Sequence, residues 1–221
     1  MLRLAVAVLA PLLMIAGPAA AADEVEYTVI ERDGAFELRQ YPPLLAAETL
    51  VTNTDFDDAG NVAFNRLFRY ISGNNRSQTR IAMTSPVVQT GHEPGTSEGE
   101  KIAMTSPVIQ QAGKPESATG DYRVAFMVPA GYTRETVPQP LDPEVNIVAT
   151  PARLMAALRF SGWVSEELHQ KKELALRAEL ATRKLAVAGE PITAQYDAPF
   201  VPGPFRRNEV LIPVSRGQPA P

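Results

Sequence analysis

The spacing of apolar and polar positions along the chain predicts two helices. Residues 57–73 begin with two aspartates and end at Gly73, and between them an apolar stripe recurs at i, i+3, i+4 and i+7. The members of this stripe are Phe64, Leu67, Phe68 and Ile71. A second, longer helix is expected over residues 163–185, with Gly189 and Pro191 as its end signals. Its apolar stripe, under a charged face, consists of Val164, Leu168, Ala175, Ala178, Ala181 and Leu185.

The segments around these helices have the composition of β-strands. Residues 27–41 hold two β-rich runs around the turn signal Asp33-Gly34, which predicts a hairpin. Further strands are expected in residues 42–51, 122–129, 145–162 with a break at Pro151, 192–200 and 208–214. Two strands, a helix and two more strands therefore occur twice. This order predicts one α+β domain whose sheet consists of two related halves.

The segment IAMTSPV occurs twice, at residues 81–87 and 102–108. In an extended chain, the Ile, Met and Ser of each copy point to one face and the Ala and Thr to the other. The proline near the end of each copy suits a strand end or edge. We interpret the repeat as a local duplication, in which two neighbouring strands joined by a polar loop place Met83 and Met104 in similar positions.

Residues 1–22 have the layout of a secretory signal peptide, with Arg3, then an apolar run, then small residues up to Ala22. We expect cleavage before Asp23 and no stable membrane anchor afterwards, because the apolar run is short for a membrane span. A single domain is expected over residues 23–214 and a disordered tail over residues 215–221. The mature chain would be periplasmic or secreted.

Composition excludes several function classes. Without Arg3, the mature chain has 20 basic and 25 acidic residues, a net charge of −5. Such an acidic protein is a poor candidate for binding nucleic acid. The chain has no cysteine, which excludes disulfides, thiolate metal sites and a cysteine nucleophile. The domain must therefore be held together by its core.

Several longer stretches resemble the SOUL haem-binding protein family, in that family's order. They are FRYISGNNRSQTRIAMTSPV (68–87), EKIAMTSPV (100–108), YRVAFMVPAGYTRETVPQPLDPEV (122–145), PARLMAALRFSGW (151–163) and FRRNEVLIPV (205–214). The resemblance extends from Tyr27 to Val214. It implies a distorted antiparallel β-barrel or curved sheet of two pseudo-symmetric halves, flanked by two main helices. It also implies reversible, non-covalent binding of haem or a related tetrapyrrole by a carrier or buffer.

The resemblance implies an apolar cleft beside the first helix and the first IAMTSPV copy. A porphyrin is a flat apolar disc with two carboxylates, so it needs apolar walls and cations at one edge, and arginine supplies these bidentately. The implied apolar contacts are Phe64, Leu67, Phe68 and Met83, and the implied propionate contacts are Arg76, Arg80, Arg206 and Arg207. Each has a simpler interpretation as a core residue, a gap filler or a surface charge.

The axial iron ligand stays unknown from the sequence. Haem iron is often held by histidine, and the chain has two, His92 in the polar loop between the repeats and His169 on the charged helix. Both are expected to be solvated side chains. Met83 and Met104 are alternative soft ligands. Without any of these, binding would depend on burial and propionate pairing alone.

Two other function classes remain as alternatives. Gly95–Gly99 matches the G-x-S-x-G elbow of hydrolases, but the elbow needs a strand before its serine and a helix after it, and neither is expected here. The implied barrel is similar to the ligand-binding domains of drug-sensing regulators, some relatives of which hydrolyse their ligands with a buried carboxylate. The strand-borne candidates are Glu37, Glu48 and Glu209. A third interpretation is a protein-interaction module that uses the long amphipathic helix.

Overall fold

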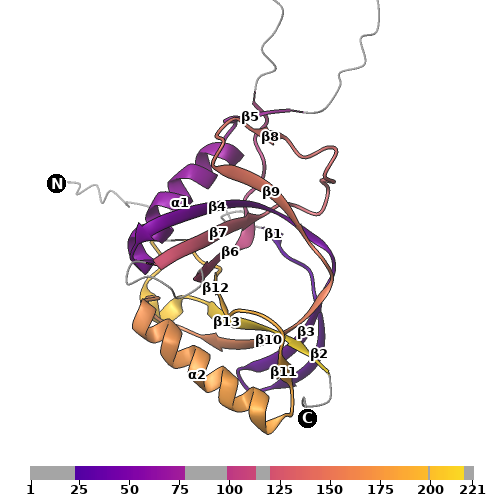
Figure 1. Cartoon of the computed structure of the whole chain (residues 1–221), viewed down its shortest axis with the longest axis vertical. Helices are drawn as coiled ribbons and strands as arrows, with labels where there is room; N and C mark the ends of the chain where they lie inside the picture. Colours follow the sequence, from indigo (N-terminus) through magenta and orange to yellow (C-terminus); the bar gives the residue numbers. More distant parts are fainter. Residues whose placement is uncertain (1–22, 78–98, 113–119, 199, 217–221) are drawn as a thin grey trace, which may run out of the picture.

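One large, curved sheet dominates the computed structural model, and two α-helices lie on its outer side (Figure 1). The structure describes residues 23–77, 99–112, 120–198 and 200–216. Over these residues the helices are α1 (Phe56–Ile71) and α2 (Glu166–Thr182), with one 3₁₀ turn, η1 (Gly203–Phe205). The strands are β1 (Asp23–Glu24), β2 (Thr28–Asp33), β3 (Phe36–Tyr41), β4 (Leu44–Thr54), β5 (Asn75–Arg76), β6 (Thr105–Ala112), β7 (Gly120–Met127), β8 (Gln139–Pro140), β9 (Val145–Thr150), β10 (Arg153–Phe160), β11 (Ala186–Val187), β12 (Ile192–Gln195) and β13 (Asn208–Ser215).

The main sheet is open. Its strand order is β2-β3-β10-β13-β12-β6-β7-β4-β9, with β1 added parallel to β6 and β11 added to β13. The end strands β2 and β9 do not pair with each other, so the expectation of a curved sheet is confirmed and the expectation of a closed barrel is wrong. Strands β5 and β8 form a separate two-stranded sheet.

The strand order follows the repeated pattern of the sequence. The first half contains β4, α1, β6 and β7, and the second contains β10, α2, β12 and β13. In both halves, the strand before the helix pairs with the last strand of the set, β4 with β7 and β10 with β13. Strands β6 and β12 pair with each other and join the halves. The geometric equivalence of the two halves stays a prediction.

The predicted hairpin and strand breaks are confirmed. Strands β2 and β3 pair around Gly34, which has a φ of 57°, a backbone conformation that glycine adopts at low cost. Pro151 lies between β9 and β10, and Pro42 and Pro43 lie between β3 and β4. Proline has no amide hydrogen for a ladder, which explains why strands end at these positions.

The first predicted helix is confirmed as α1. Its start is capped by Asp55, whose side chain accepts a hydrogen bond from the Asp58 amide at 2.8 Å. Gly73 follows its end with a φ of 115°. Within the predicted stripe, Leu67 is fully buried, whereas Phe68 is 48% exposed and lies at the solvent edge of the stripe. The helix therefore packs on the sheet mainly through Ala63, Leu67, Tyr70 and Ile71.

The second helix is shorter than predicted, and its predicted apolar stripe is only partly confirmed: Val164, Leu168 and Leu185 pack against the core. It starts after the cap Ser165 and ends at Thr182, well before Gly189. The buried residues are Leu176 and Leu180, while the three alanines of the predicted stripe are exposed. The sequence ELALRAELA alternates leucine and alanine, and burial of the larger leucines removes more apolar surface from water. The alanine stripe was therefore the wrong face.

The second IAMTSPV copy is only partly a strand. Strand β6 begins at Thr105, so the predicted strand is wrong for residues 102–104. The predicted alternation holds there, because Ile102 and Met104 pack in one cluster and Ala103 between them is exposed. Pro107 lies inside β6 rather than at a strand end, at an irregularity where the register against β7 shifts between Thr105 and Val108. Such a bulge leaves positions without ladder bonds, and a proline fits there. The first copy lies outside the described residues.

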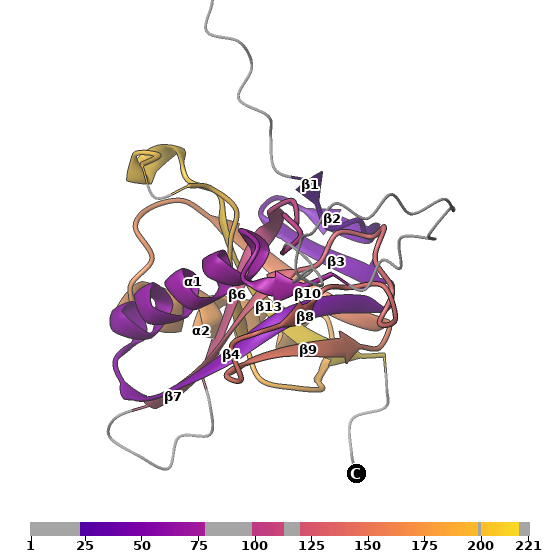
Figure 2. The same ribbon diagram turned by 90° about the horizontal axis from the view of Figure 1, so that it is seen from above.

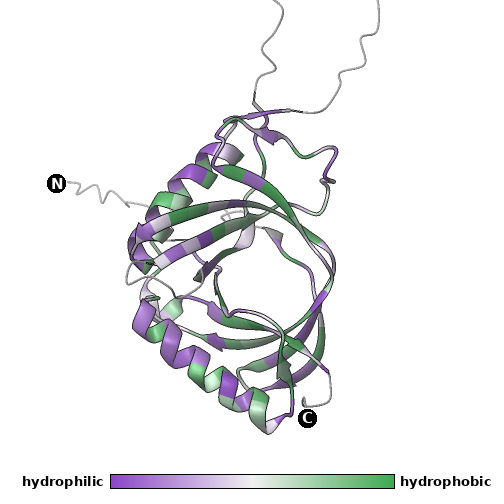
Figure 3. Ribbon diagram, in the orientation of Figure 1, coloured by the Kyte–Doolittle hydropathy of each residue, from purple (hydrophilic) through white to green (hydrophobic). Residues whose placement is uncertain are grey.

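Apolar residues fill both faces of the curved sheet. The outer face packs against α1 and α2, and a separate inner cluster draws on β3, β10, β12 and β13. Figure 3 shows hydrophobic residues along the strands and hydrophilic ones along much of α2. Both helices lie at one side of the molecule, with β3 and β9 toward the other (Figure 2). Neither helix in the described part of the chain is long and apolar enough to cross a membrane.

Candidate functional site

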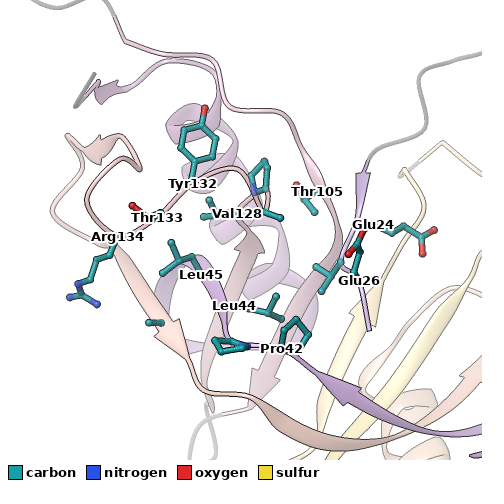
Figure 4. A pocket seen from close by; sticks show the side chains of 15 residues that line it. Glu24, Glu26, Pro42, Leu44, Leu45, Thr105, Val128, Tyr132, Thr133 and Arg134 are labelled. Atoms are coloured by element: carbon teal, nitrogen blue, oxygen red, sulfur yellow. The ribbon is translucent and has the colours of Figure 1, made fainter. Parts of the chain in front are cut away.

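A cavity of about 640 Å³ opens where β1, the start of β4 and the loop after β7 meet (Figure 4). Its size lies within the range of small-molecule and cofactor sites. Apolar side chains form most of its wall, among them Val25, Pro42, Pro43, Leu44, Leu45 and Val128. Strand β6 contributes Thr105 and the edge strand β9 contributes Ala149.

Local sequence explains why the cavity forms here. Pro42 and Pro43 interrupt the chain between β3 and β4, and Pro129 does the same after β7. The Tyr132 amide then donates to the Pro129 carbonyl at 3.1 Å, which turns the chain back across the strand ends. The hollow therefore lies where neighbouring strands stop pairing.

The ring of Tyr132 is a fixed part of the cavity wall. Its hydroxyl donates to the Glu100 carboxylate at 2.6 Å, and the Ser77 hydroxyl donates to the other carboxylate oxygen at 2.8 Å. These hydrogen bonds, from Tyr132 first and Ser77 second, lower the pKa of Glu100, and the bond to Glu100 raises the pKa of Tyr132 to about 12. The phenol oxygen points away from the other lining side chains (Figure 4). A bound molecule would therefore meet the ring rather than the hydroxyl.

Polar groups lie at opposite ends of the cavity. Figure 4 shows Glu24, Glu26 and Thr105 on one side and Arg134 on the other. Arg207, which directly precedes β13, donates to both oxygens of Glu24 at 3.0 and 2.8 Å and compensates its charge. The lining among the described residues contains no histidine or methionine.

A buried ionic network lies beside a second, much smaller cavity that shares Val25 and Leu44 with the first. Arg39 donates to both oxygens of Glu209 at 2.5 and 2.9 Å, and the Tyr196 hydroxyl donates to Glu209 at 2.7 Å. Burial alone would raise the pKa of Glu209, but the hydrogen bonds and charge of Arg39, then Tyr196, outweigh it and lower that pKa. Glu209 is therefore ionised near neutral pH, and it does not show the raised pKa that a buried catalytic acid needs.

The other two carboxylates proposed for hydrolysis are ion-paired as well. Glu37 contacts Arg32 and Arg39, each at 2.7 Å, and Glu48 contacts Arg123 at 2.9 Å. Gly99 is the one residue of the segment 95–99 that the structure describes, so the hydrolase elbow lies outside the described residues.

The helix residues implied by the family resemblance lie in the core or at the surface, and none lines the cavity. Leu67 is fully buried between α1 and the sheet. Phe64 packs on Phe126, with ring centroids 5.3 Å apart, and stacks on exposed Phe68 at 5.9 Å. Met104, from the second IAMTSPV copy, packs against the same cluster.

The implied arginines are dispersed. Arg76 is an exposed residue of β5 that pairs with Gln139. Arg206 is nearly buried, donates to the Val201 carbonyl at 2.7 Å and stacks over Trp163 at 3.8 Å. Arg207, paired with Glu24, is the implied arginine nearest the cavity among those described. Arg80, Met83 and His92 lie outside the described residues.

His169 is not the solvated side chain that the sequence suggested. Its Nδ1 lies 2.6 Å from the Thr193 hydroxyl, and its ring stacks on Phe56 at 6.1 Å. Burial lowers its pKa, against the opposing charges of Glu173 and Glu166. Across the described ranges, no group of three or more histidine, cysteine, aspartate or glutamate side chains is placed to hold a metal ion.

None of the residues that line the cavity was predicted as a site residue from the sequence; among them, Thr105, Tyr132 and Arg134 carry polar or aromatic chemistry. Tyr132 and Arg134 belong to the PAGYTRE segment, where glycine, proline and an aromatic residue mark a structured loop. Thr105 belongs to the second IAMTSPV copy, directly after Met104. Strand β6 is irregular at its start, so the regular alternation of a strand does not predict which way the Thr105 side chain points.

Comparison with known proteins matches one family over nearly the whole described chain. The model of the family described as "SOUL heme-binding protein" matches residues 22–97 and 93–213. Heme-binding protein 1 of Xenopus tropicalis is 28% identical over 181 residues, which cover 81% of this chain and 84% of that protein. Heme-binding protein 2 of Homo sapiens is 27% identical, over 81% of this chain and 78% of that protein.

Solved structures share the fold at low sequence identity. The C-terminal domain of EcmrR has a TM-score of 0.58 at 11% identity, covering 86% of this chain and 99% of that domain. A hydrolase from Listeria innocua has a TM-score of 0.51 at 11% identity, over 84% of this chain and 94% of that one. At these identities, the likeness concerns the fold alone.

Proposed function

The chain belongs to the SOUL haem-binding protein family, and from this membership we propose that it binds haem or a related tetrapyrrole non-covalently in the cavity beside β1. The observation that carries the proposal is the cavity itself, about 640 Å³ in volume with a mainly apolar wall. Its volume suits a cofactor-sized ligand. Two relatives named as heme-binding proteins, which match most of this chain, support the same ligand class.

The lining residues fit a flat, amphiphilic disc. The prolines, Leu44, Leu45 and Val128 supply apolar contact, and the fixed Tyr132 ring supplies a surface for stacking. Arg134, at the end away from Glu24 and Glu26, is the cation toward which propionates would point. Arg207 would act indirectly, because it compensates the charge of Glu24.

Retention of the ligand would depend on burial and propionate pairing. The described part of the wall offers neither histidine nor methionine to an iron atom, so these residues are suited to reversible binding of both metallated and metal-free rings. Bound haem would supply an iron centre, while this chain's residues would shield the disc from water and orient its carboxylates. We therefore propose a carrier or buffer.

We also propose that the carrier works in the periplasm or outside the cell. The support is the leader-like pattern of residues 1–22, which precedes β1 directly. Mass spectrometry of the protein recovered from the periplasmic or secreted fraction should give a chain that begins at Asp23. A chain retained in the cytoplasm with Met1 would refute this location and leave the ligand proposal untouched.

Titration with ferric haem and metal-free protoporphyrin, followed by absorbance, tests the ligand proposal. The wild-type protein should bind each at one-to-one stoichiometry. Ala149→Phe should weaken both by roughly tenfold or more, because Ala149 lies on an edge strand at the cavity and the larger side chain fills it. Ala175→Phe, on the exposed face of α2, is the matched control and should bind normally.

Two further variants locate the site. Arg134→Gln should lower the affinity for protoporphyrin by roughly tenfold, because its free carboxylates pair with arginine. The affinity for the uncharged dimethyl ester should not change. Phe68→Ser should have little effect if the cavity is the site. Loss of binding in Phe68→Ser with normal binding in Ala149→Phe would move the site to the outer face of α1. No saturable binding of either ring would reject the function.

A further inference from the structure

The hydroxyl of Thr105 has no hydrogen-bond partner. Among the described residues, it is the one buried side-chain nitrogen or oxygen atom in this condition. Thr105 is 4% exposed and lines the large cavity at the start of β6. A buried polar atom without a partner is costly, and such atoms in native proteins call for an explanation. A hydrogen bond from a bound molecule would satisfy it.

The charge beside Thr105 restricts which chemical group of a ligand can form a hydrogen bond with its hydroxyl. Strand β1 runs parallel to β6, with Glu24 opposite Ser106, and the charge of Glu24 is compensated by Arg207. Glu26 also lies on this side of the cavity and forms no ion pair with any described residue (Figure 4). A carboxylate of the ligand would be repelled here, because like charges at short range disfavour each other. The partner of Thr105 is therefore an uncharged group that can form a hydrogen bond.

The cavity thus has a cation at one end and an uncharged hydrogen-bonding position at the other. The propionates of a tetrapyrrole fit the Arg134 end. In haem and protoporphyrin, the edge opposite the propionates carries vinyl groups, which cannot bond to a hydroxyl. In an open-chain tetrapyrrole such as biliverdin, the terminal rings at that edge carry lactam carbonyl and N–H groups.

We propose that this cavity selects open-chain tetrapyrroles over closed rings, with Thr105 as the specificity-determining residue that bonds a terminal lactam. This inference rests on the proposed function and adds the ligand class to it. The Thr105 hydroxyl donates to the lactam carbonyl or accepts from the lactam N–H, and either bond satisfies the buried atom. The Glu26 carboxylate reinforces the orientation, because its negative charge keeps the propionates at the Arg134 end.

The test compares biliverdin with protoporphyrin in wild type and in Thr105→Val, which keeps the shape of the side chain and removes the hydroxyl. Biliverdin should bind wild type more tightly than protoporphyrin does. Thr105→Val should lower the affinity for biliverdin by roughly five- to tenfold, the usual contribution of one buried hydrogen bond. The affinity for protoporphyrin should change less than about twofold. Thr28→Val, at an exposed threonine of the edge strand β2 outside the cavity lining, is the matched control and should change neither affinity.

Folding of the variant is checked separately. Because the hydroxyl has no partner in the ligand-free protein, Thr105→Val should unfold at the same temperature as wild type or slightly above it. Equal effects of Thr105→Val on both ligands, or no effect on biliverdin, would overturn the role of Thr105 while haem binding stands. Failure of every tetrapyrrole to bind would reject the proposed function itself, so the two failures are distinguishable.

Discussion

At the scale of single residues, the most consequential contact is the buried pair of Arg39 and Glu209. Their side chains are 2% and 0% exposed, and they are 170 residues apart in sequence. The network also includes the Tyr196 and Tyr41 hydroxyls, the Glu37 carboxylate beside Arg39, and Arg207 beside Glu209. A buried charge is tolerated only when it is paired, so each partner depends on the other.

Removal of one partner should therefore be severe. Arg39→Met should lower the free energy of unfolding by about 3–5 kcal/mol at neutral pH, because it removes the close bidentate partner of the buried Glu209 charge and leaves only the longer contact to Arg207. Urea unfolding followed by circular dichroism measures this change. The double variant Arg39→Met with Glu209→Leu should recover most of the loss. A cost below about 1 kcal/mol for Arg39→Met would show that Glu209 is solvated or neutral.

His169 gives the fold a dependence on acid. Burial lowers its pKa in the folded state below the unfolded value of 6.5, so both states are neutral at higher pH and the contribution to stability is fully present there. As the pH falls below 6.5, the unfolded state takes up a proton before the folded state does, and stability is lost. Replacement by Gln should flatten the fall in unfolding free energy between pH 7.5 and pH 5. An unchanged slope would mean that His169 titrates normally.

At the scale of elements, variants of α2 test whether the helix packs on the sheet through its leucine face or through its alanine stripe. Leu180→Ala should lower the free energy of unfolding by about 2–5 kcal/mol, because Leu180 is 1% exposed and its removal leaves a cavity against the sheet. Ala178→Gln, on the stripe that the sequence favoured, should change it by no more than about 0.5 kcal/mol. Urea unfolding of both variants measures the two changes in the free energy of unfolding and so shows which face is buried. The reverse order of effects would restore the predicted stripe.

The elements also differ in how well sequence patterns predict them. The first helix was predictable because Phe64, Leu67 and Ile71 recur at helical spacing and Gly73 ends it. In α2, leucine and alanine are interleaved, and no local rule decides which face meets the sheet. The cavity was harder still, because Thr105, Tyr132 and Leu44 come from three segments. Pairing of β4, β6 and β7 brings them together, and the pattern of a single strand does not encode that pairing.

At the scale of the whole molecule, the two halves share one core. Strand β6 of the first half pairs with β12 of the second, through Ile109 opposite Ala194. The inner cluster joins Tyr41 from β3, Ile192 from β12 and Leu211 from β13, and Ile109 packs against it. The Arg39–Glu209 pair lies within the same sheet. Neither half could bury these side chains alone.

Because the core is shared, we expect residues 23–221 to unfold in a single cooperative transition despite the two-part sequence pattern. Far-ultraviolet circular dichroism and the fluorescence of Trp163, which lies in the second half, should give coincident transitions. Ala194→Asp should abolish folding of both halves together, because it buries a charge at the seam where Ala194 is fully enclosed. A saturating tetrapyrrole should raise the midpoint temperature of this single transition. Two separate transitions, of which the ligand shifts only one, would show that the halves are independent domains and that the ligand contacts one of them.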